Sequence, residues 1–219
     1  EDPLLSARLA AAWIRGAEGT GVATSLKHYA VNNQERRRMY IDAVVEDRAL
    51  HELYLASFEG AVRDGRPRSV MCAYNKVNGV PCSEHAFLND GVLRGEWGFE
   101  GFVVSDYTAD EELIAHGFAA DEREAARRAF LAGTDVSMQS GLYMRHLPEL
   151  VRSGDVSMAR LDQAVRRVLR VKQRLGLFEQ PFRGLQEDAP GAPSRFDGNA
   201  HRQLAREAAQ RCIVLLKNS

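Results

Sequence analysis

The chain has 219 residues and a mass of 24.4 kDa, and its 29 basic side chains nearly balance 30 acidic ones. Its 45% hydrophobic and 27% charged residues exclude a disordered, collagen-like or coiled-coil chain and indicate a globular fold. The net charge of -1 offers no basic surface to a polyanion, and no apolar run approaches the ~20 residues of a membrane span. We therefore expect neither nucleic acid nor a membrane as a partner.

Short apolar runs alternate with helical patterns along the chain. The runs are residues 24–29, 69–74, 101–105 and 134–137, and we predict that each forms a parallel strand. Their ends are spaced close to the ~30 residues of a βα repeat. The sequence therefore predicts an α/β fold with about four βα units.

The segments between these runs carry helix signals. Residues 47–63 show an apolar stripe at helical spacing that includes Leu50, Tyr54 and Phe58. Asp121 is expected to cap the start of a helix, in a capping-box-like pattern, and this helix ends at Gly133. We predict a longer helix from Ser157, its N-cap, to residue 176.

The composition changes near the C-terminus. Residues 179–199 are rich in proline and glycine and are interpreted as an interdomain linker. A predicted helix at residues 201–211 leads to the apolar run 213–216, which reads as the first strand of another domain. With no initiator Met and no readable signal segment, we interpret the chain as a piece of a longer polypeptide, divided into residues 1–178, 179–199 and 200–219.

Polar side chains follow the predicted strands at their carboxyl ends, where active sites of parallel α/β folds form. They are Lys27, His28, Tyr74, Asn75, Ser105, Asp106 and Tyr107. Asp106 follows a run expected to be buried, so its carboxylate needs partners or a catalytic task. The plainer alternatives are that Asp106 caps the next segment and that Lys27 and His28 are ordinary surface residues.

The remaining reactive side chains give weak signals. Cys72 and Cys82 could form a disulfide if the protein is exported, or they could be two buried thiols. The histidines outside the strand ends fit no ligand spacing, so we expect no metal site; they are His51, His85, His116, His146 and His201. The run of arginines at 36–38 is interpreted as a solvated loop face.

Three long motifs resemble glycoside hydrolase family 3. They are SLKHYAVNNQE at residues 25–35, SVMCAYNKVNGV at 69–80 and LRGEWGFEGFVVSDY at 93–107. The likeness continues through AGTD at 132–135 and LGLFEQPF at 175–182 to REAAQRCIVLLKN at 206–218, so it covers essentially the whole chain.

This resemblance implies a retaining β-glycosidase that needs no cofactor. Asp106 matches the family's nucleophile, which forms a covalent glycosyl-enzyme. Lys27 and His28 match the pair that binds sugar hydroxyls, and Tyr74 matches the tyrosine beside the nucleophile. Met71 and Tyr107 match positions that line the same pocket. The implied fold is the second half of a (β/α)8 barrel, a linker and the start of an α/β sandwich domain.

The resemblance also bears on specificity. The NNQE motif after Lys27-His28 favours a β-glucosidase acting on terminal β-D-glucosyl residues, whereas Tyr107 in place of the commoner tryptophan also occurs in β-xylosidase-like members. Besides a β-xylosidase, the alternatives are a non-catalytic sugar-binding remnant and an unrelated barrel enzyme with Lys27 as a Schiff-base amine. The expected partner is a small β-glucoside or oligosaccharide.

The family pattern places two parts of the machinery outside this chain. A sugar-binding aspartate and arginine lie upstream, and the acid/base glutamate lies downstream. Glu35, Glu96 and Glu100 match loop or helix positions of the family pattern and are interpreted as structural. Asp135, at a strand end, is interpreted first as a packing and hydrogen-bonding residue. We expect the isolated chain to be poorly soluble and inactive, because half a barrel exposes sheet edges. A periplasmic or extracellular location is favoured over a cytoplasmic one.

Overall fold

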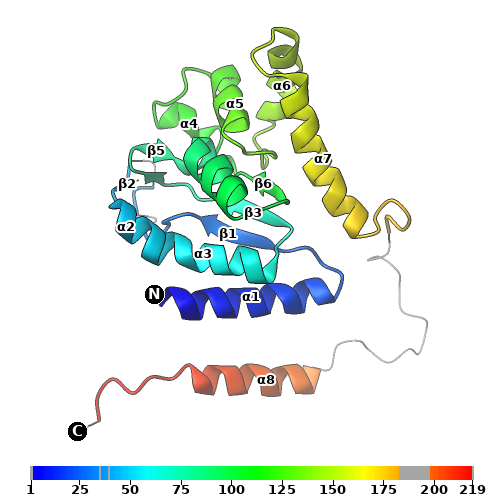
Figure 1. The fold of residues 1–219 in the computed structure, drawn as a ribbon. Helices are drawn as coiled ribbons and strands as arrows, with labels where there is room; N and C mark the ends of the chain where they lie inside the picture. Colours follow the sequence, from blue (N-terminus) through cyan, green and yellow to red (C-terminus); the bar gives the residue numbers. More distant parts are fainter. Residues whose placement is uncertain (1, 35, 39, 183–197, 219) are drawn as a thin grey trace. The chain divides into compact units, whose positions relative to one another are not determined.

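The computed structural model describes residues 2–34, 36–38, 40–182 and 198–218. The chain divides into two units, residues 1–179 and residues 180–219. The first unit is an α/β structure in which helices flank short parallel strands (Figure 1). Glu35 and most of the predicted linker, residues 183–197, lie outside the described residues.

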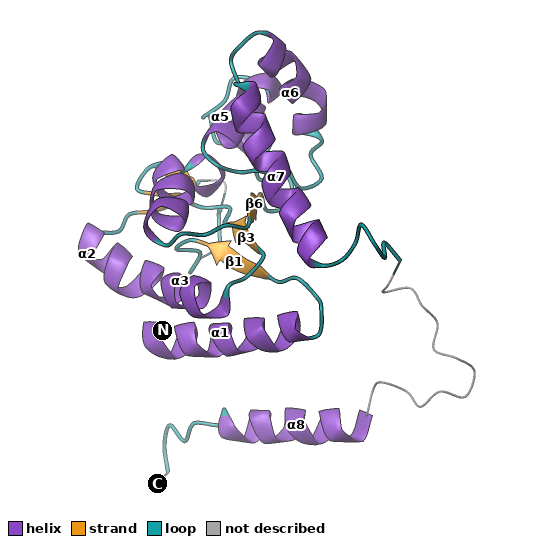
Figure 2. Ribbon diagram, turned by 45° about the vertical axis from the view of Figure 1, so that its right-hand side comes forward, coloured by secondary structure: helices purple, strands orange, loops and turns teal. Residues whose placement is uncertain are grey.

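The main sheet is parallel and follows chain order, with β1 (Ser25–Tyr29), β3 (Ser69–Cys72) and β6 (Phe102–Val104) as neighbours. All three strands lie within the predicted apolar runs. The central strand, β3, is buried along its whole length, which explains why it reads as an uninterrupted apolar run. Figure 2 shows the three strands side by side.

The prediction of a fourth strand at residues 134–137 is wrong. It makes one isolated parallel bridge, between Val104 and Val136. The amides of Asp135 and Val136 both donate to the Val103 carbonyl, at 2.8 and 3.0 Å, so the regular ladder stops there. The backbone then turns at Gln139, which has a positive φ of 72°.

The predicted helix at 47–63 forms and continues to Gly65. It consists of α2 (Asp47–Ala49), α3 (Ala56–Gly60) and the π-type turns η1 (Leu50–Leu55) and η2 (Ala61–Gly65). α1 (Pro3–Gly19), which the sequence patterns did not predict, packs against α3 and η2. The helices approach closely at Gly60, where a Cβ atom would lie 2.6 Å from the Cβ of Ala7.

A hydrophobic core joins this helix to the sheet. Tyr29, at the end of β1, packs edge-on against Phe58 at 5.2 Å and against Trp97 at 5.9 Å, measured between ring centroids. Its hydroxyl donates to the carbonyl of Leu88 on η4 (Phe87–Glu96), another π-type helix. These contacts fix the end of β1 and therefore the position of His28 beside it.

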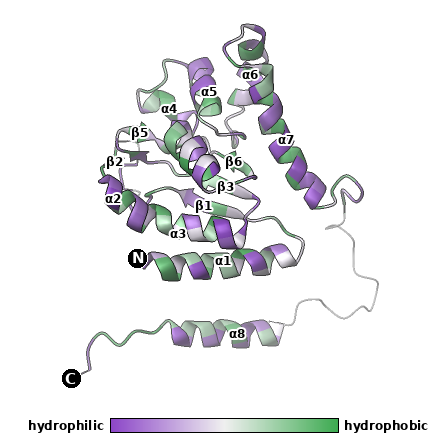
Figure 3. Cartoon of the chain, in the orientation of Figure 1, coloured by the Kyte–Doolittle hydropathy of each residue, from purple (hydrophilic) through white to green (hydrophobic). Residues whose placement is uncertain are grey.

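A second core lies among the helices that follow β6: α4 (Glu112–Ala115), α5 (Glu122–Leu131), α6 (Leu142–Arg152) and α7 (Met158–Arg174). The predicted caps are confirmed: Asp121 accepts from the Glu124 amide at 2.8 Å, and Ser157 accepts from the Arg160 amide at 3.2 Å. Figure 3 shows both hydrophobic and hydrophilic segments on α7, as expected for a helix with one packed face.

Three short strands form a second sheet beside the main one: β2 (Asp42–Ala43), β4 (Lys76–Val77) and β5 (Val80–Pro81). β4 and β5 form a hairpin, and Asn78 in its turn has a φ of 49°. The Asn78 amide group bonds both the N–H and the carbonyl of Val45.

The second unit contains α8 (Gly198–Arg211), which starts three residues before the predicted helix. Residues 213–216 are exposed and have no ladder partner within the described chain, so the first strand of another domain stays a prediction. Across the described residues, no helix combines the length and apolar character that crossing a membrane requires.

Candidate active site

His28 and Asp106 meet at the carboxyl edge of the main sheet. His28 is the penultimate residue of β1, and Asp106 follows β6 by two residues. Parallel strands end at the same edge, and here the Nε2 atom of His28 lies 3.3 Å from Oδ2 of Asp106. The predicted convergence of these two strand ends is therefore confirmed.

The Asp106 carboxylate is nearly enclosed, with 8% of the residue exposed. One carboxylate oxygen, Oδ1, accepts a hydrogen bond from the Tyr107 amide at 2.7 Å. The other oxygen, Oδ2, faces His28. A carboxylate held by one backbone donor and one imidazole keeps a defined orientation while leaving acceptor capacity for a ligand.

Tyr74 lies beside Asp106, two residues after β3. Its hydroxyl donates to the Tyr107 carbonyl at 3.0 Å. Burial and then the negative charge of Asp106 raise the pKa of Tyr74 to about 12. The phenol therefore remains protonated, and remains a hydrogen-bond donor, throughout the ordinary pH range. Tyr107 itself is 55% exposed, so its ring is available at the surface of the site.

Arg38 joins this group, and the interpretation of residues 36–38 as a solvated loop face is wrong for it. Its guanidinium lies over the Tyr74 ring, 3.8 Å from the centroid, and its Nη2 atom is 3.4 Å from Oε1 of Glu112. Burial is the main cause of a raised pKa at Glu112; Arg38 opposes the shift and the charge of Asp106 adds to it. The only sequence signal for Arg38 is its place in the loop that leaves the carboxyl end of β1.

Lys27 lies at the surface, whereas Met71 is buried. Lys27 is exposed and lines, with His28, a cavity of ≈ 750 Å³ whose other walls come from α1, the loop at 31–33 and the helix at 47–65. Its exposure does not fit the desolvated amine that Schiff-base chemistry needs. Met71 is buried within β3 in register with Val104, two residues before Asp106.

Cys72 and Cys82 are free, fully buried thiols in the structure, so the disulfide alternative is not realised there. Burial raises the pKa of both thiols to about 12. Cys72 lies near the side chains of Thr134 and Asn89, and Cys82 near the Ala30 carbonyl. Within the described ranges, no three His, Cys, Asp or Glu side chains are arranged to hold a metal ion.

These features define an α/β fold that presents a buried carboxylate, an imidazole and a tyrosine at one sheet edge. Residues 1–171 match the family model for the glycosyl hydrolase family 3 N terminal domain. The chain belongs to this family, as the sequence motifs predicted.

Several relatives match the whole chain. It is 42% identical to thermostable beta-glucosidase B of Acetivibrio thermocellus and 37% identical to a periplasmic beta-glucosidase of Salmonella typhimurium, and it covers 26% and 29% of their lengths. It is 36% identical to an exo-alpha-(1->6)-L-arabinopyranosidase of Bifidobacterium breve, covering 26% of that protein. The chain thus spans between a quarter and a third of each relative.

The fold has a solved counterpart. A crystal structure of beta-glucosidase from Listeria innocua matches all of this chain and 31% of its own, with a TM-score of 0.91 and 35% identity. Other structures of that enzyme contain glucose or, in a D270A mutant, laminaribiose. The structure and the comparisons therefore agree on an α/β fold of the glycosyl hydrolase family 3 type.

Proposed function

We propose that this chain supplies the nucleophile and part of the sugar-binding surface of a retaining β-glucosidase. The observation that carries the proposal is the enclosed Asp106 carboxylate in contact with His28 at the carboxyl edge of the sheet. Lys27, Met71, Tyr74 and Tyr107 are proposed to contact the sugar or shape its pocket. The substrate is a small β-glucoside or oligosaccharide, and the chemistry uses no cofactor.

The reaction takes two displacements. An Asp106 carboxylate oxygen forms a bond to the anomeric carbon as the glycosidic C–O bond breaks, and a general acid protonates the departing oxygen. Water then attacks the anomeric carbon and gives its proton to the same group acting as a base. The C–O bond to Asp106 breaks, which releases the sugar and restores the carboxylate. Tyr74, as a protonated phenol beside Asp106, can donate to the nucleophile or to a sugar oxygen once its hydroxyl turns away from the Tyr107 carbonyl.

The acid/base group and the rest of the barrel are proposed to lie elsewhere in the full-length protein. The strands follow chain order in a parallel sheet with helices between them, the arrangement from which a (β/α)8 barrel is built. The described sheet has β1 at one edge and the Val136 bridge at the other. Further βα units would pair with these edges and close the barrel.

Specificity for terminal β-D-glucosyl residues is favoured over the alternatives. The beta-glucosidase names of the A. thermocellus, S. typhimurium and L. innocua proteins support it, while the B. breve protein is named for a pentopyranose, a sugar of the xylose size class. A xyloside-type preference on the same fold is therefore the second candidate. The periplasmic relative supports a location outside the cytoplasm.

The test is hydrolysis by the full-length protein, with aryl β-glucoside and aryl β-xyloside compared and the first-formed anomer identified by NMR. We expect kcat/KM to favour the glucoside, the β-anomer to appear first, and Asp106→Asn to abolish turnover. Initial formation of the α-anomer would refute the retaining mechanism. Sugar binding without turnover would support the non-catalytic remnant instead.

A further inference from the structure

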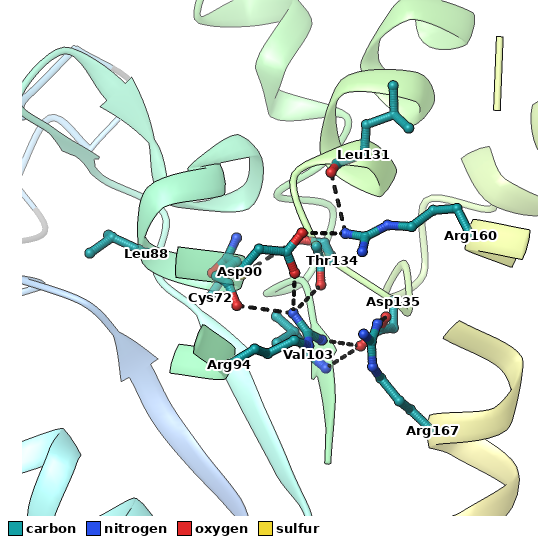
Figure 4. Close-up of polar contacts among 12 residues, drawn as sticks. Cys72, Leu88, Asp90, Arg94, Val103, Leu131, Thr134, Asp135, Arg160 and Arg167 are labelled. Atoms are coloured by element: carbon teal, nitrogen blue, oxygen red, sulfur yellow. Dashed lines mark hydrogen bonds and ion pairs between the residues drawn. The ribbon is translucent and has the colours of Figure 1, made fainter. Parts of the chain in front are cut away.

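A buried ionic network lies beside β6, the strand that Asp106 follows by two residues. Figure 4 shows its centre, where the Asp135 carboxylate is bracketed by Arg94 from η4 and Arg167 from α7. The Asp135 side chain is only 3% exposed, and its Oδ1 atom accepts from Arg167 at 2.7 Å. A second pair, Asp90 with Arg160, continues the network along α7.

Asp135 also forms hydrogen bonds with the backbone of β6. Its Oδ2 atom accepts from the Val103 amide at 2.9 Å, and its own amide donates to the Val103 carbonyl at 2.8 Å. One residue therefore holds both polar groups of Val103. Asp106 lies three residues further along the same backbone.

The segment after Asp135 continues this contact past the end of β6. The Ser105 amide donates to the Val136 carbonyl at 2.9 Å, and the Ser105 hydroxyl accepts from the Met138 amide at 2.8 Å. The Thr108 amide donates to the Met138 carbonyl at 3.0 Å. The residues on either side of Asp106 are thus bonded to the segment that Asp135 begins.

We infer that Asp135 is a positioning residue for the Asp106 carboxylate, and this inference rests on the proposed function of Asp106. The two guanidinium groups fix the Asp135 carboxylate, and that carboxylate fixes the position of the β6 backbone at Val103. Displacements of about 1 Å at a reacting group can cost about 10²-fold in rate, so this support affects chemistry as well as stability. This extends the sequence-based interpretation of Asp135 as a packing and hydrogen-bonding residue.

The chain offers a matched pair of variants on one helix. Arg167→Met removes the α7 partner of Asp135, whereas Arg160→Met removes the α7 partner of Asp90. Asp90 reaches Asp135 only through the shared Arg94 and makes no hydrogen bond to Val103 among the described contacts. Both arginines are mostly buried, with side chains 16% and 20% exposed. Both changes therefore break a comparable pair, but only the first removes a direct partner of Asp135.

The experiment measures inactivation of the full-length protein by a 2-deoxy-2-fluoro-β-glucoside, separating the rate constant of covalent trapping from the binding constant. We expect Arg167→Met and Asp135→Asn to lower the trapping rate constant about tenfold or more with little change in binding, and Arg160→Met to stay within about twofold of wild type. Circular dichroism confirms folding, and if Asp135→Asn does not fold, the arginine pair decides.

Equal trapping rates for Arg167→Met and Arg160→Met would overturn the inference and leave Asp135 a structural residue. Failure of the wild-type protein to be trapped would refute the proposed function itself, so the two failures are distinguishable. A matching loss of folding stability in the two arginine variants, with loss of trapping rate confined to Arg167→Met, is the expected pattern.

Discussion

Glu112 is the described carboxylate that most nearly competes for the acid/base role, and replacing it tests whether that role lies outside this chain. It stands near Asp106, burial raises its pKa, and Arg38 holds one of its oxygens. A raised pKa near a nucleophile is what a general acid requires. In the proposed site, Glu112 instead holds Arg38 over Tyr74.

The magnitudes separate the two roles. The Arg38–Glu112 pair is partly exposed, with side chains 38% and 16% accessible, so its loss should cost about 1 kcal/mol. This corresponds to roughly a fivefold change in KM or kcat/KM, because 1.4 kcal/mol corresponds to a factor of ten. Removing a general acid/base instead lowers the rate ~10²–10⁴-fold.

The assay compares Glu112→Gln with Glu84→Gln in the full-length protein. Glu84 is a suitable control because it also pairs with an arginine, Arg128, and burial also raises its pKa. We expect Glu112→Gln to lower kcat/KM about fivefold, with the pH profile kept, and Glu84→Gln to affect stability alone. A loss of ~10²-fold or more together with a changed pH profile would instead place the acid/base at Glu112.

The other predictions concern the thiols, Tyr74 and a helix cap. Because the pKa of each buried thiol is about 12, Cys72 and Cys82 should resist iodoacetamide in the native protein at pH 8, while exposed Cys212 reacts. Peptide mapping tests this, and a Cys72–Cys82 disulfide in non-reducing maps would contradict it. Tyr74→Phe should lower kcat yet leave the activity profile between pH 5 and 9 unchanged, because a phenol with a pKa of about 12 does not lose its proton there; a shifted alkaline limb would contradict the assignment. Asp121→Ala should reduce the free energy of unfolding by about 1 kcal/mol through loss of the cap on α5, measured by urea denaturation, and an unchanged midpoint would show that the cap does not contribute.

Local patterns predicted the parts of the fold that local physics determines. The caps at Asp121 and Ser157 and the helix predicted at residues 47–63 follow from side chains within a few residues of one another. β3 and the end of β6 were predictable because a strand covered on both faces must be apolar, whereas β1 alternates exposed and more buried positions. The short β2–β4–β5 sheet was not predicted, because strands of two residues carry no periodic pattern.

The features that were predicted wrongly depend on contacts between distant segments of the chain. Residues 134–137 have strand-like composition, yet the side chain of Asp135 takes the Val103 amide and the ladder stops. Arg38 looks like part of a charged loop until the fold brings it over Tyr74, 36 positions along the chain. Conversely, the His28–Asp106 contact was predictable, because both residues stand at the carboxyl ends of strands in one parallel sheet.

The residue that a 2-deoxy-2-fluoro-β-glucoside labels in the full-length protein decides whether Asp106 is the nucleophile. Peptic digestion and tandem mass spectrometry should find one fluoroglucosyl group, on the peptide containing Ser105-Asp106-Tyr107, with the ester on Asp106. Asp106→Asn should carry no label. A fluoroglucosyl ester on any other carboxylate, or turnover of β-glucosides by Asp106→Asn at the wild-type rate, would contradict the account.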